Sequence, residues 1–395
     1  MIQTTQNNRI LLELSLIPNI GPAIIIQVIQ ALGTKEQRLY QRDEWFKWPD
    51  LDLTVVHSLT HKDAIEFIGL TPKQAGLLID GLNNKKWLDE ELELFEQHPE
   101  FRLLTIFDKE YPILLSQIHL PPPVLYLWGQ KLSPDSLKLA MVGSRNAGFY
   151  AASVVKKLVP EFVAHDWELV SGGALGVDSL VHQTTIAEQG KTIVVLGSGL
   201  LDLYPASNRK LFEKIAADFG TVISAFPFRA LPDKGNFPAR NRIISGLSLG
   251  TVIIQAAEKS GALITAQYAL EQGRQVFAVP GSITDPLSAG CHALIKDGAK
   301  LVTCVRDIVE EFGMPDEAIC EGKQEVVESF KSGTNGEIQG SIEHYLLAYL
   351  QEPQTIDTLL EQTKNSIAIL QGELFELQLE GIVTQNHAGY WQKKF

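Results

Sequence analysis

The stretch TIVVLG at Thr192–Gly197 is an unbroken run of β-branched and apolar residues that ends in a glycine. A second run of this kind, TVII at Thr251–Ile254, stands further along the chain. Strands that are apolar on both faces are typical of the middle of a parallel sheet that helices cover on both sides. The two runs therefore predict an α/β domain with a doubly wound sheet.

Working outward, similar apolar runs alternate with helix-period stretches. The predicted strands are Leu137–Gly143, Glu168–Gly172, Thr192–Gly197, Thr221–Phe226, Gly250–Ala256, Gln275–Pro280 and Lys300–Val305. The predicted helices between them are Ala151–Ala164, Val177–Gln189, Asn208–Phe219, Ile264–Gln272 and His292–Lys296. Repeated β–α units of this length predict a parallel sheet domain over residues 96–313.

The flanking segments have a different pattern. Residues 1–95 predict short helices broken by turns. The Gly-Pro turn at Ile17–Pro22 has two possible structural interpretations. It either belongs to a helix–hairpin–helix element that offers backbone N–H groups to phosphate, or joins an ordinary helical hairpin. The second is favoured because no Lys or Arg follows before Lys35. Residues 314–340 are interpreted as a polar linker, and residues 341–395, with three helix patterns and a hairpin, as a winged-helix-like module.

The distribution of charge restricts where an anionic partner can bind. The chain of 395 residues carries a net charge of −13, of which residues 1–136 hold −6 and residues 314–395 hold −8. Residues 137–313 are at +1, so only this segment is expected to supply the positive potential that phosphate needs. The acidic C-terminal module is expected to contact protein rather than DNA.

Composition indicates a cytoplasmic protein. No apolar run approaches the length that spans a bilayer, and the N-terminal residues lack the basic and apolar regions of a secretory signal. The three cysteines, Cys291, Cys304 and Cys320, have neither paired spacing nor a histidine cluster beside them. They predict neither a disulfide framework nor a metal site.

Glycines and polar residues gather where two predicted strands end, which is where an open parallel sheet binds its ligands. Gly143-Ser144-Arg145 combines a tight turn with a hydroxyl and a guanidinium that suit phosphate, although a structural salt bridge would equally explain Arg145. The stretch SGGALGVD at Ser171–Asp178 indicates backbone N–H groups facing an anion at Gly172 and Gly173, or else a tight turn.

The strongest cationic segment is RALPDKGNFPARNR at Arg229–Arg242, interpreted as a loop that leads into an apolar helix. Lys234 and the arginines can follow a phosphate backbone, and Phe237 can stack on an unpaired base unless it packs in the core. Of Arg240 and Arg242, one is expected to face the ligand and the other an internal carboxylate.

Catalytic groups are not indicated. Asp178 and His182 lie four residues apart and could form an acid–base pair, but capping and a buried hydrogen bond explain them more simply. The chain contains no P-loop, no Gly-x-Gly-x-x-Gly opening its first sheet helix and no nucleophile elbow. We expect binding chemistry without a catalytic residue, cofactor or metal.

With these segments in view, the sequence resembles the DNA-processing protein A family (DprA, also called Smf). The matching stretches are GSR at Gly143–Arg145, SGGALGVD at Ser171–Asp178, LGSGL at Leu196–Leu200, Tyr204-Pro205, NFPARNRIISGLS at Asn236–Ser248, KSG at Lys259–Gly261 and FAVPG at Phe277–Gly281. The resemblance implies an extended Rossmann domain that binds incoming single-stranded DNA during natural transformation. It also implies a homodimer and loading of the recombinase RecA onto that strand.

By these motifs, the resemblance implies one DNA-binding site. Its expected residues are Gly143, Ser144, Arg145, Gly172, Gly173, Lys234, Asn236, Phe237, Arg240, Asn241 and Arg242. Three positions depart from the family pattern. Ala225 and Gln255 stand where the family commonly has acidic residues, and Ala262 stands where it commonly has serine.

Two other functions fit parts of the pattern. A nucleotide phosphoribohydrolase also uses a glycine-rich strand-to-helix loop, but with a catalytic Glu and a Pro-Gly-Gly opening that this chain lacks. A protein-binding scaffold would place the function in the acidic outer modules, and would be insensitive to Arg145→Ala and Lys234→Ala.

Overall fold

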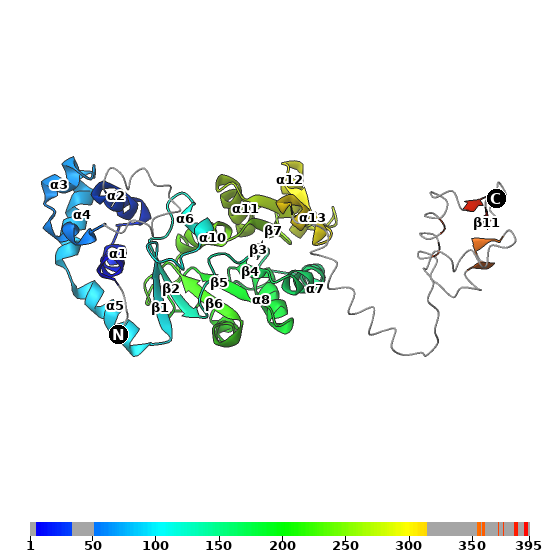
Figure 1. The fold of residues 1–395 in the computed structure, drawn as a ribbon, viewed down its shortest axis with the longest axis horizontal. Helices are drawn as coiled ribbons and strands as arrows, with labels where there is room; N and C mark the ends of the chain where they lie inside the picture. The colour runs from blue at the N-terminus through cyan, green and yellow to red at the C-terminus, as the bar shows by residue number, and fades with distance from the viewer. Residues whose placement is uncertain are drawn as a thin grey trace. The chain divides into compact units, whose positions relative to one another are not determined.

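The computed structural model describes residues 5–33 and 51–313 (Figure 1). In the last part of the chain it describes only residues 354–356, 358–359, 370, 374, 383–385 and 391–393. The chain divides into two compact units, Met1–Gly322 and Lys323–Phe395. No helix in the described part of the chain is long and apolar enough to cross a membrane.

The seven predicted strands are confirmed and form the parallel part of one sheet. They are β3 (Lys138–Val142), β4 (Glu168–Ser171), β5 (Thr192–Leu196), β6 (Gly220–Ser224), β7 (Gly250–Ile253), β8 (Gln275–Ala278) and β9 (Lys300–Leu301). They lie in the order β6-β5-β4-β3-β7-β8-β9, each parallel to its neighbours. Every residue of β3 to β7 is buried, as unbroken apolar runs require.

Helices cover both faces of this sheet (Figure 1). They are α7 (Phe149–Ala164), α8 (Val177–Ala187), α9 (Arg209–Lys214), α10 (Asn236–Gly246), α11 (Gly261–Glu271), α12 (Ala289–Lys296) and α13 (Arg306–Val309). Alternate residues of β3 enter two different cores: Leu139 and Met141 pack with α7, whereas Ala140 and Val142 belong to the core that contains α10 and α11. This alternation follows from the two-residue period of a strand.

The strand order reverses direction at β3. From β3 the chain moves through β4 and β5 to β6, and then returns to place β7 on the other side of β3. Such a switch point leaves a crevice at the carboxyl ends of the two strands, where α/β sheets bind ligands. We therefore expect the site between the loops that follow β3 and β7.

Two further strands extend the sheet and were not predicted. β1 (Phe101–Thr105) and β2 (Val124–Gly129) pair antiparallel with each other, and β2 pairs antiparallel with β6. Tyr126 of β2 packs with Phe95 and Phe228 in a cluster of stacked and edge-on rings. The sheet is therefore parallel in seven strands and antiparallel at one edge.

The N-terminal helices are confirmed as short and separated by turns. They are α1 (Gln6–Leu16), α2 (Pro22–Leu32), the 3-10 helix η3 (Leu53–Ser58), α3 (His61–Glu66), α4 (Pro72–Asn83) and α5 (Lys86–Gln97). The turns before α2 and α4 are built alike. Each contains a residue of positive φ, Asn19 or Gly69, two residues before the helix N-cap, and a proline in the first helical turn.

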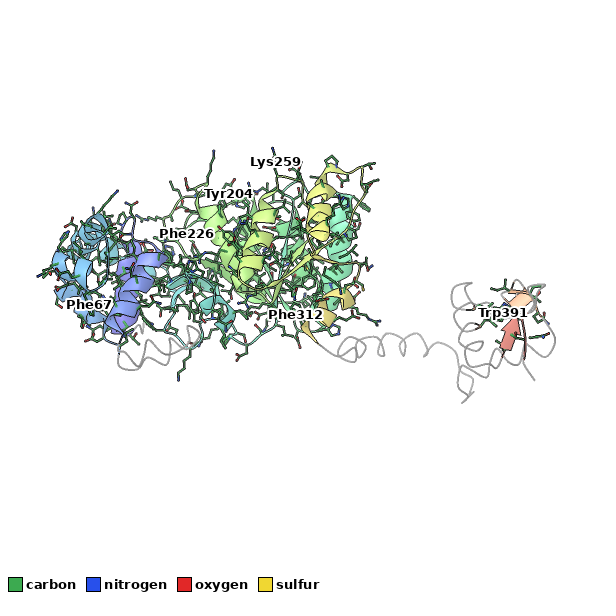
Figure 2. All side chains as sticks on the ribbon, turned by 90° about the horizontal axis from the view of Figure 1, so that it is seen from above. Phe67, Tyr204, Phe226, Lys259, Phe312 and Trp391 are labelled. Atoms are coloured by element: carbon green, nitrogen blue, oxygen red, sulfur yellow. The ribbon has the colours of Figure 1, made fainter. Side chains whose placement is uncertain are left out.

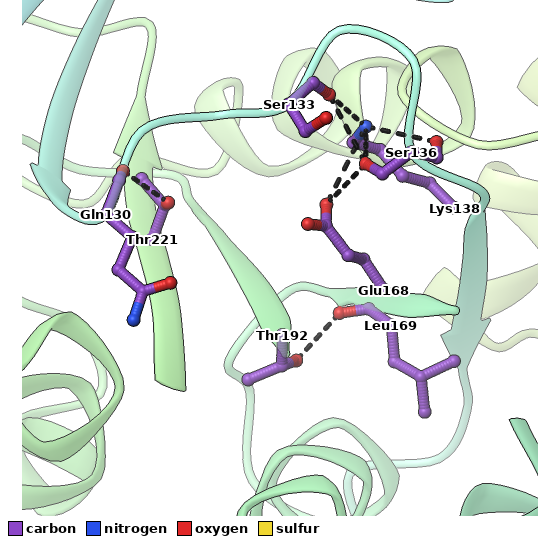
Figure 3. Close-up of polar contacts among 8 residues, drawn as sticks. All are labelled: Gln130, Ser133, Ser136, Lys138, Glu168, Leu169, Thr192 and Thr221. Carbon is purple, nitrogen blue, oxygen red and sulfur yellow. Dashed lines mark hydrogen bonds and ion pairs between the residues drawn. The ribbon is translucent and has the colours of Figure 1, made fainter. Parts of the chain in front are cut away.

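A buried polar network lies at the amino ends of β3 and β4 (Figure 3). The Lys138 side chain is only 2% exposed, and its Nζ donates hydrogen bonds to Ser133 O and Ser136 Oγ. Glu168 Oε2 lies 3.7 Å from this ammonium. Burial lowers the pKa of Lys138, and Glu168 acts against that shift. The network is at the end of the sheet opposite the predicted site.

In the second unit, β10 (Val383–Gln385) and β11 (Trp391–Lys393) form an antiparallel pair where the hairpin was predicted. The three helix patterns that would complete a winged helix lie largely outside the described residues. The winged-helix-like module stays a prediction, and the predicted linker at 314–340 also lies outside the described residues.

Candidate nucleic-acid interface

A pocket of about 580 Å³ opens at the switch point, beside the carboxyl ends of β3 and β7. Seven predicted site residues line it: Gly143, Ser144, Arg145, Lys234, Phe237, Arg240 and Asn241. The loop after β7 and the start of α11 complete the wall with Ala257, Ser260, Gly261, Ala262 and Thr265. The predicted residues Gly172, Gly173, Asn236 and Arg242 are not part of the lining.

Two cations of the pocket are free to meet a ligand. Arg145 and Lys234 are exposed, and in the described residues no carboxylate lies within ion-pair distance of either. The Arg145 guanidinium lies over the Phe237 ring, with Cζ 5.5 Å from the ring centroid. A guanidinium stacked in this way can still direct its N–H groups at a phosphate, because they lie in its plane.

The segment interpreted as a cationic loop is helical from Asn236 onward, which corrects that part of the prediction. On α10, Phe237, Arg240 and Asn241 stand three and four residues apart and therefore share one face. That face lines the pocket, whereas Asn236 and Arg242 are directed elsewhere. Asn236 Nδ2 donates to Leu231 O, and Arg242 Nη1 donates to His119 O at 2.6 Å.

Phe237 lies in a half-buried position between a glycine and a second ring. A Cβ atom on Gly197 would stand 3.0 Å from Phe237 Cδ1, so the missing side chain provides the space for the ring. The Tyr204 ring lies 5.7 Å from the Phe237 ring, tilted by 53°. Sequence reasoning did not place Tyr204 in the site, although Tyr204-Pro205 was among the matching motifs.

Arg240 is an internal anchor. Its side chain is buried, and Nη1 donates hydrogen bonds to Gly172 O and to Val195 O, the latter at 2.7 Å. Burial lowers the pKa of Arg240 to about 10, and the nearby Asp178 carboxylate acts against that shift. Of the two arginines on α10, Arg240 is the one beside an internal carboxylate.

Gly172 and Gly173 support the site through their carbonyl oxygens rather than lining it. Gly172 O accepts from Arg240, and Gly173 O accepts from Asn208 Nδ2 at 2.8 Å. A Cβ on Gly172 would collide with the Arg240 guanidinium, and Gly173 has a φ of +67°. Both positions need glycine for close packing and backbone conformation.

The loop after β3 is held from two sides. Ser144 N donates to Gln255 O at 2.7 Å, and Ser144 Oγ accepts from Asn146 N at 3.1 Å. The hydroxyl proton of Ser144 therefore remains available for a ligand. Gln255, at a departure from the family pattern, is 2% exposed, and its Nε2 donates to Asp285 Oδ2 at 3.1 Å.

Asp178 and His182 do not form a joint site. His182 is fully buried, and its Nδ1 lies 2.7 Å from Thr192 Oγ1, whose hydroxyl donates to Leu169 O. Nδ1 must therefore carry the proton, and burial lowers the pKa of His182 to about 3. Asp178 has a raised pKa because it is buried, with Arg240 opposing the rise. Among the described residues, no group of three His, Cys, Asp or Glu side chains is arranged to hold a metal ion.

Comparison with known proteins gives consistent matches. Residues 102–313 match the family model of DNA recombination-mediator protein A. The chain is 30% identical to protein Smf of Synechocystis over 96% of this chain and 97% of the relative. It is 44% identical to the DNA processing protein DprA of Bacillus subtilis, over 53% of this chain and 70% of the relative.

A solved structure agrees with these matches. The X-ray structure of DNA processing protein A from Streptococcus pneumoniae superposes with a TM-score of 0.64 at 33% identity, covering 79% of this chain and 99% of that chain. The family model covers the sheet from the second residue of β1 to β9, including every residue that lines the pocket. This chain belongs to the DNA recombination-mediator protein A family.

Proposed function

We propose that the chain binds single-stranded DNA at the switch-point pocket, with Arg145 and Lys234 on phosphates and Phe237 against a base. The observation that carries this proposal is the arrangement of two exposed, unpaired cations around a half-buried aromatic ring. Proteins that bind single strands without strict sequence reading combine a positive groove with an aromatic platform in this way.

An unpaired strand fits this site better than a duplex. The half-buried ring of Phe237 projects from α10 against Gly197 and lines the pocket, so a base must leave a duplex stack to reach it. The overall charge of −13 disfavours general attraction to DNA and restricts binding to this local positive site. We therefore expect weak binding to duplex DNA.

We further propose that the site binds without catalysis. Asp178, the acid at the pocket, is already engaged by the backbone N–H of Ala174 and lies beside Arg240. His182, the other candidate, is enclosed in the core. The alternative to be measured beside DNA binding is hydrolysis of a nucleotide, which the related phosphoribohydrolase pattern suggests.

The wider role follows from family membership. We propose that a homodimer of this protein receives incoming strands during natural transformation in the cytoplasm and loads RecA onto them. The description of the family as a recombination mediator supports this role. Its test is the DNA-dependent ATPase activity of RecA on strands coated with single-strand-binding protein, which the chain should increase. A sedimentation equilibrium measurement tests the dimer.

The binding test is fluorescence anisotropy of a labelled oligonucleotide, single- and double-stranded, over a salt series. Arg145→Ala and Lys234→Ala should each weaken single-strand binding by about tenfold or more, since each removes a charge-assisted contact. Each should also reduce the slope of log K against log salt by about 0.7. Lys191→Ala is the matched control, because Lys191 is exposed at the amino end of β5.

Equal and weak binding by all four proteins would refute the site and direct attention to nucleotide hydrolysis. Loss of binding in Lys191→Ala as well would show that any surface cation contributes, which would also contradict a localised site.

A further inference from the structure

The aromatic platform contains a second ring beyond Phe237. Tyr204 is 44% exposed while its ring contacts Phe237, and its hydroxyl has no recorded hydrogen bond among the described residues. Figure 2 shows Tyr204 and Lys259 along the same edge of the first unit, where the loops after β5 and β7 emerge. Tyr204 thus stands next to the pocket, on the side of β5.

The segment that carries Tyr204 is held by contacts with the loop that follows β4. Asn208 is buried, and its Nδ2 donates to Gly173 O and to Ser179 Oγ, both at 2.8 Å. Phe212, at the middle of α9, packs against Gly173, where a Cβ would lie 2.8 Å from its ring. These contacts hold the segment from Tyr204 to α9 over the carboxyl ends of β4 and β5.

Two cations follow directly after this anchor. Arg209 and Lys210 open α9, both are exposed, and in the described part of the chain neither has an ion-pair partner. The acids of the same segment are the half-buried Asp202 and the exposed Glu213. The ring of Tyr204 contacts Phe237, over which Arg145 lies, and Arg209 and Lys210 follow Tyr204 along the chain.

We propose that Tyr204 stacks on a second base of the bound strand, and that the strand continues over the ends of β4 and β5 to Arg209 and Lys210. The proposal rests on the proposed single-strand function and extends the same site. Successive bases stack on successive aromatic side chains along a positive groove in proteins of this kind. Two rings in contact, with Arg145 over one of them and Arg209 and Lys210 following the other along the chain, fit that pattern.

A path in the opposite direction is the competing outcome. Phe149, at the start of α7, is 90% exposed, and its neighbour Tyr150 donates a hydrogen bond to Pro280 O after β8. A strand leaving the pocket on that side would pass Phe149 instead of Tyr204. We favour Tyr204 because its ring directly contacts Phe237, whereas no ring contact of Phe149 is recorded among the described residues.

The test uses the full chain and a labelled oligothymidylate of about 20 nucleotides, which is longer than the site of a typical single-strand-binding domain. Tyr204→Ala should weaken binding about 5- to 150-fold, the range for removal of one stacked aromatic. Tyr204→Phe keeps the ring and should bind like the wild type. Arg209→Ala combined with Lys210→Ala should lower the salt slope by about 1.4, for two lost phosphate contacts. Phe67→Ala, which removes an exposed ring of the N-terminal module, is the matched control and should change nothing.

A spectroscopic measurement separates stacking on DNA from mere support of Phe237. Tyr204→Trp keeps a ring at this position, and its added emission should be quenched when DNA binds. Unchanged emission together with full affinity would overturn the proposal, because the ring would then contact no base.

Three other outcomes decide between the path past Tyr204, a path on the opposite side and no binding at all. If the wild type binds and Arg145→Ala abolishes binding, but Tyr204→Ala binds normally, the extended path is wrong and the pocket function stands. If Phe149→Ala weakens binding and Tyr204→Ala does not, the strand leaves on the opposite side. If the wild type itself does not bind, both the proposed function and this extension are refuted.

Discussion

At the scale of single residues, the chemistry of a side chain and its placement have separate causes. Arg145 and Arg240 carry the same guanidinium, and both lie within 6 Å of the Phe237 centroid. Arg145 stands on a surface loop and has no carboxylate partner in the part of the chain that the structure describes, whereas Arg240 is 5% exposed and bonded to two backbone carbonyl oxygens. In the proposed function, the first therefore contacts the ligand, while the second supports the glycine loop through its bond to Gly172 O.

His182 gives a prediction at this scale. Its pKa in the folded chain is about 3, well below the ordinary value of 6.5, because burial disfavours the charged imidazolium. Between these two pH values the unfolded chain binds a proton that the folded chain does not, so stability falls as the pH is lowered. The loss from this one group should approach about 1.4 kcal/mol per pH unit within that window.

The measurement is urea denaturation of wild type and His182→Asn from pH 7 to pH 4. An asparagine amide can replace Nδ1–H as donor to Thr192 Oγ1 without titrating. The stability of the variant should therefore depend less on pH than that of the wild type. Parallel curves for the two proteins would show that His182 is not the group responsible.

At the scale of elements, the pocket depends on how loops are tied to one another. Ser144 N, in the loop after β3, donates a hydrogen bond to Gln255 O. The side chain of Gln255 donates in turn to Asp285, the residue that caps the 3-10 helix η6 (Pro286–Ser288). An amide at position 255 can donate to a carboxylate, and a carboxylate there could not. Gln255, which departs from the family pattern, thus has a hydrogen-bond partner in this chain, the carboxylate of Asp285.

Gln255→Glu is expected to destabilise the protein by about 2 kcal/mol at pH 7, because it sets a buried carboxylate against the half-buried Asp285. Repulsion raises the pKa of one of them, so the penalty should shrink as the pH falls and that carboxyl becomes protonated. Thermal unfolding at pH 7 and at pH 5 tests this. Gln255→Met, which loses the hydrogen bond but adds no charge, is the control and should show no such recovery at pH 5.

At the scale of the whole molecule, the two compact units differ in charge and in content. The unit Met1–Gly322 contains the sheet, the pocket and all predicted site residues. Residues 323–395 contain 5 Lys and Arg against 10 Asp and Glu, a charge of −5, while residues 137–313 are at +1. An acidic unit repels DNA wherever it comes within about a Debye length of the strand.

A chain that ends at Gly322 is expected to fold, since the contacts of the first unit lie within it. Its affinity for single-stranded DNA at low salt should equal or exceed that of the full chain, because the ten acidic residues after Gly322 are gone. Circular dichroism on heating and the anisotropy titration check the two statements. A truncated chain that is unfolded, or folded with lower affinity, would contradict them; the latter would indicate that the C-terminal unit contributes to binding.

The sequence by itself determined the seven parallel strands, the helices between them and the edge of the sheet where the site lies. Unbroken apolar runs and β–α spacing are local patterns, and the carboxyl ends of parallel strands necessarily share one edge. For that reason Arg145, Lys234 and Phe237 could be predicted to come together although the chain between them is long.

Only the tertiary structure decided which predicted residues face the pocket. The face of α10 depends on the residue where that helix begins, and Asn236 as its start places Phe237, Arg240 and Asn241 together while excluding Arg242. The antiparallel strands β1 and β2 and the contact between Tyr204 and Phe237 arise from pairing between distant segments. Such pairing depends on how the surfaces of distant segments fit together in the folded chain. The local periodicity of the sequence therefore does not predict it.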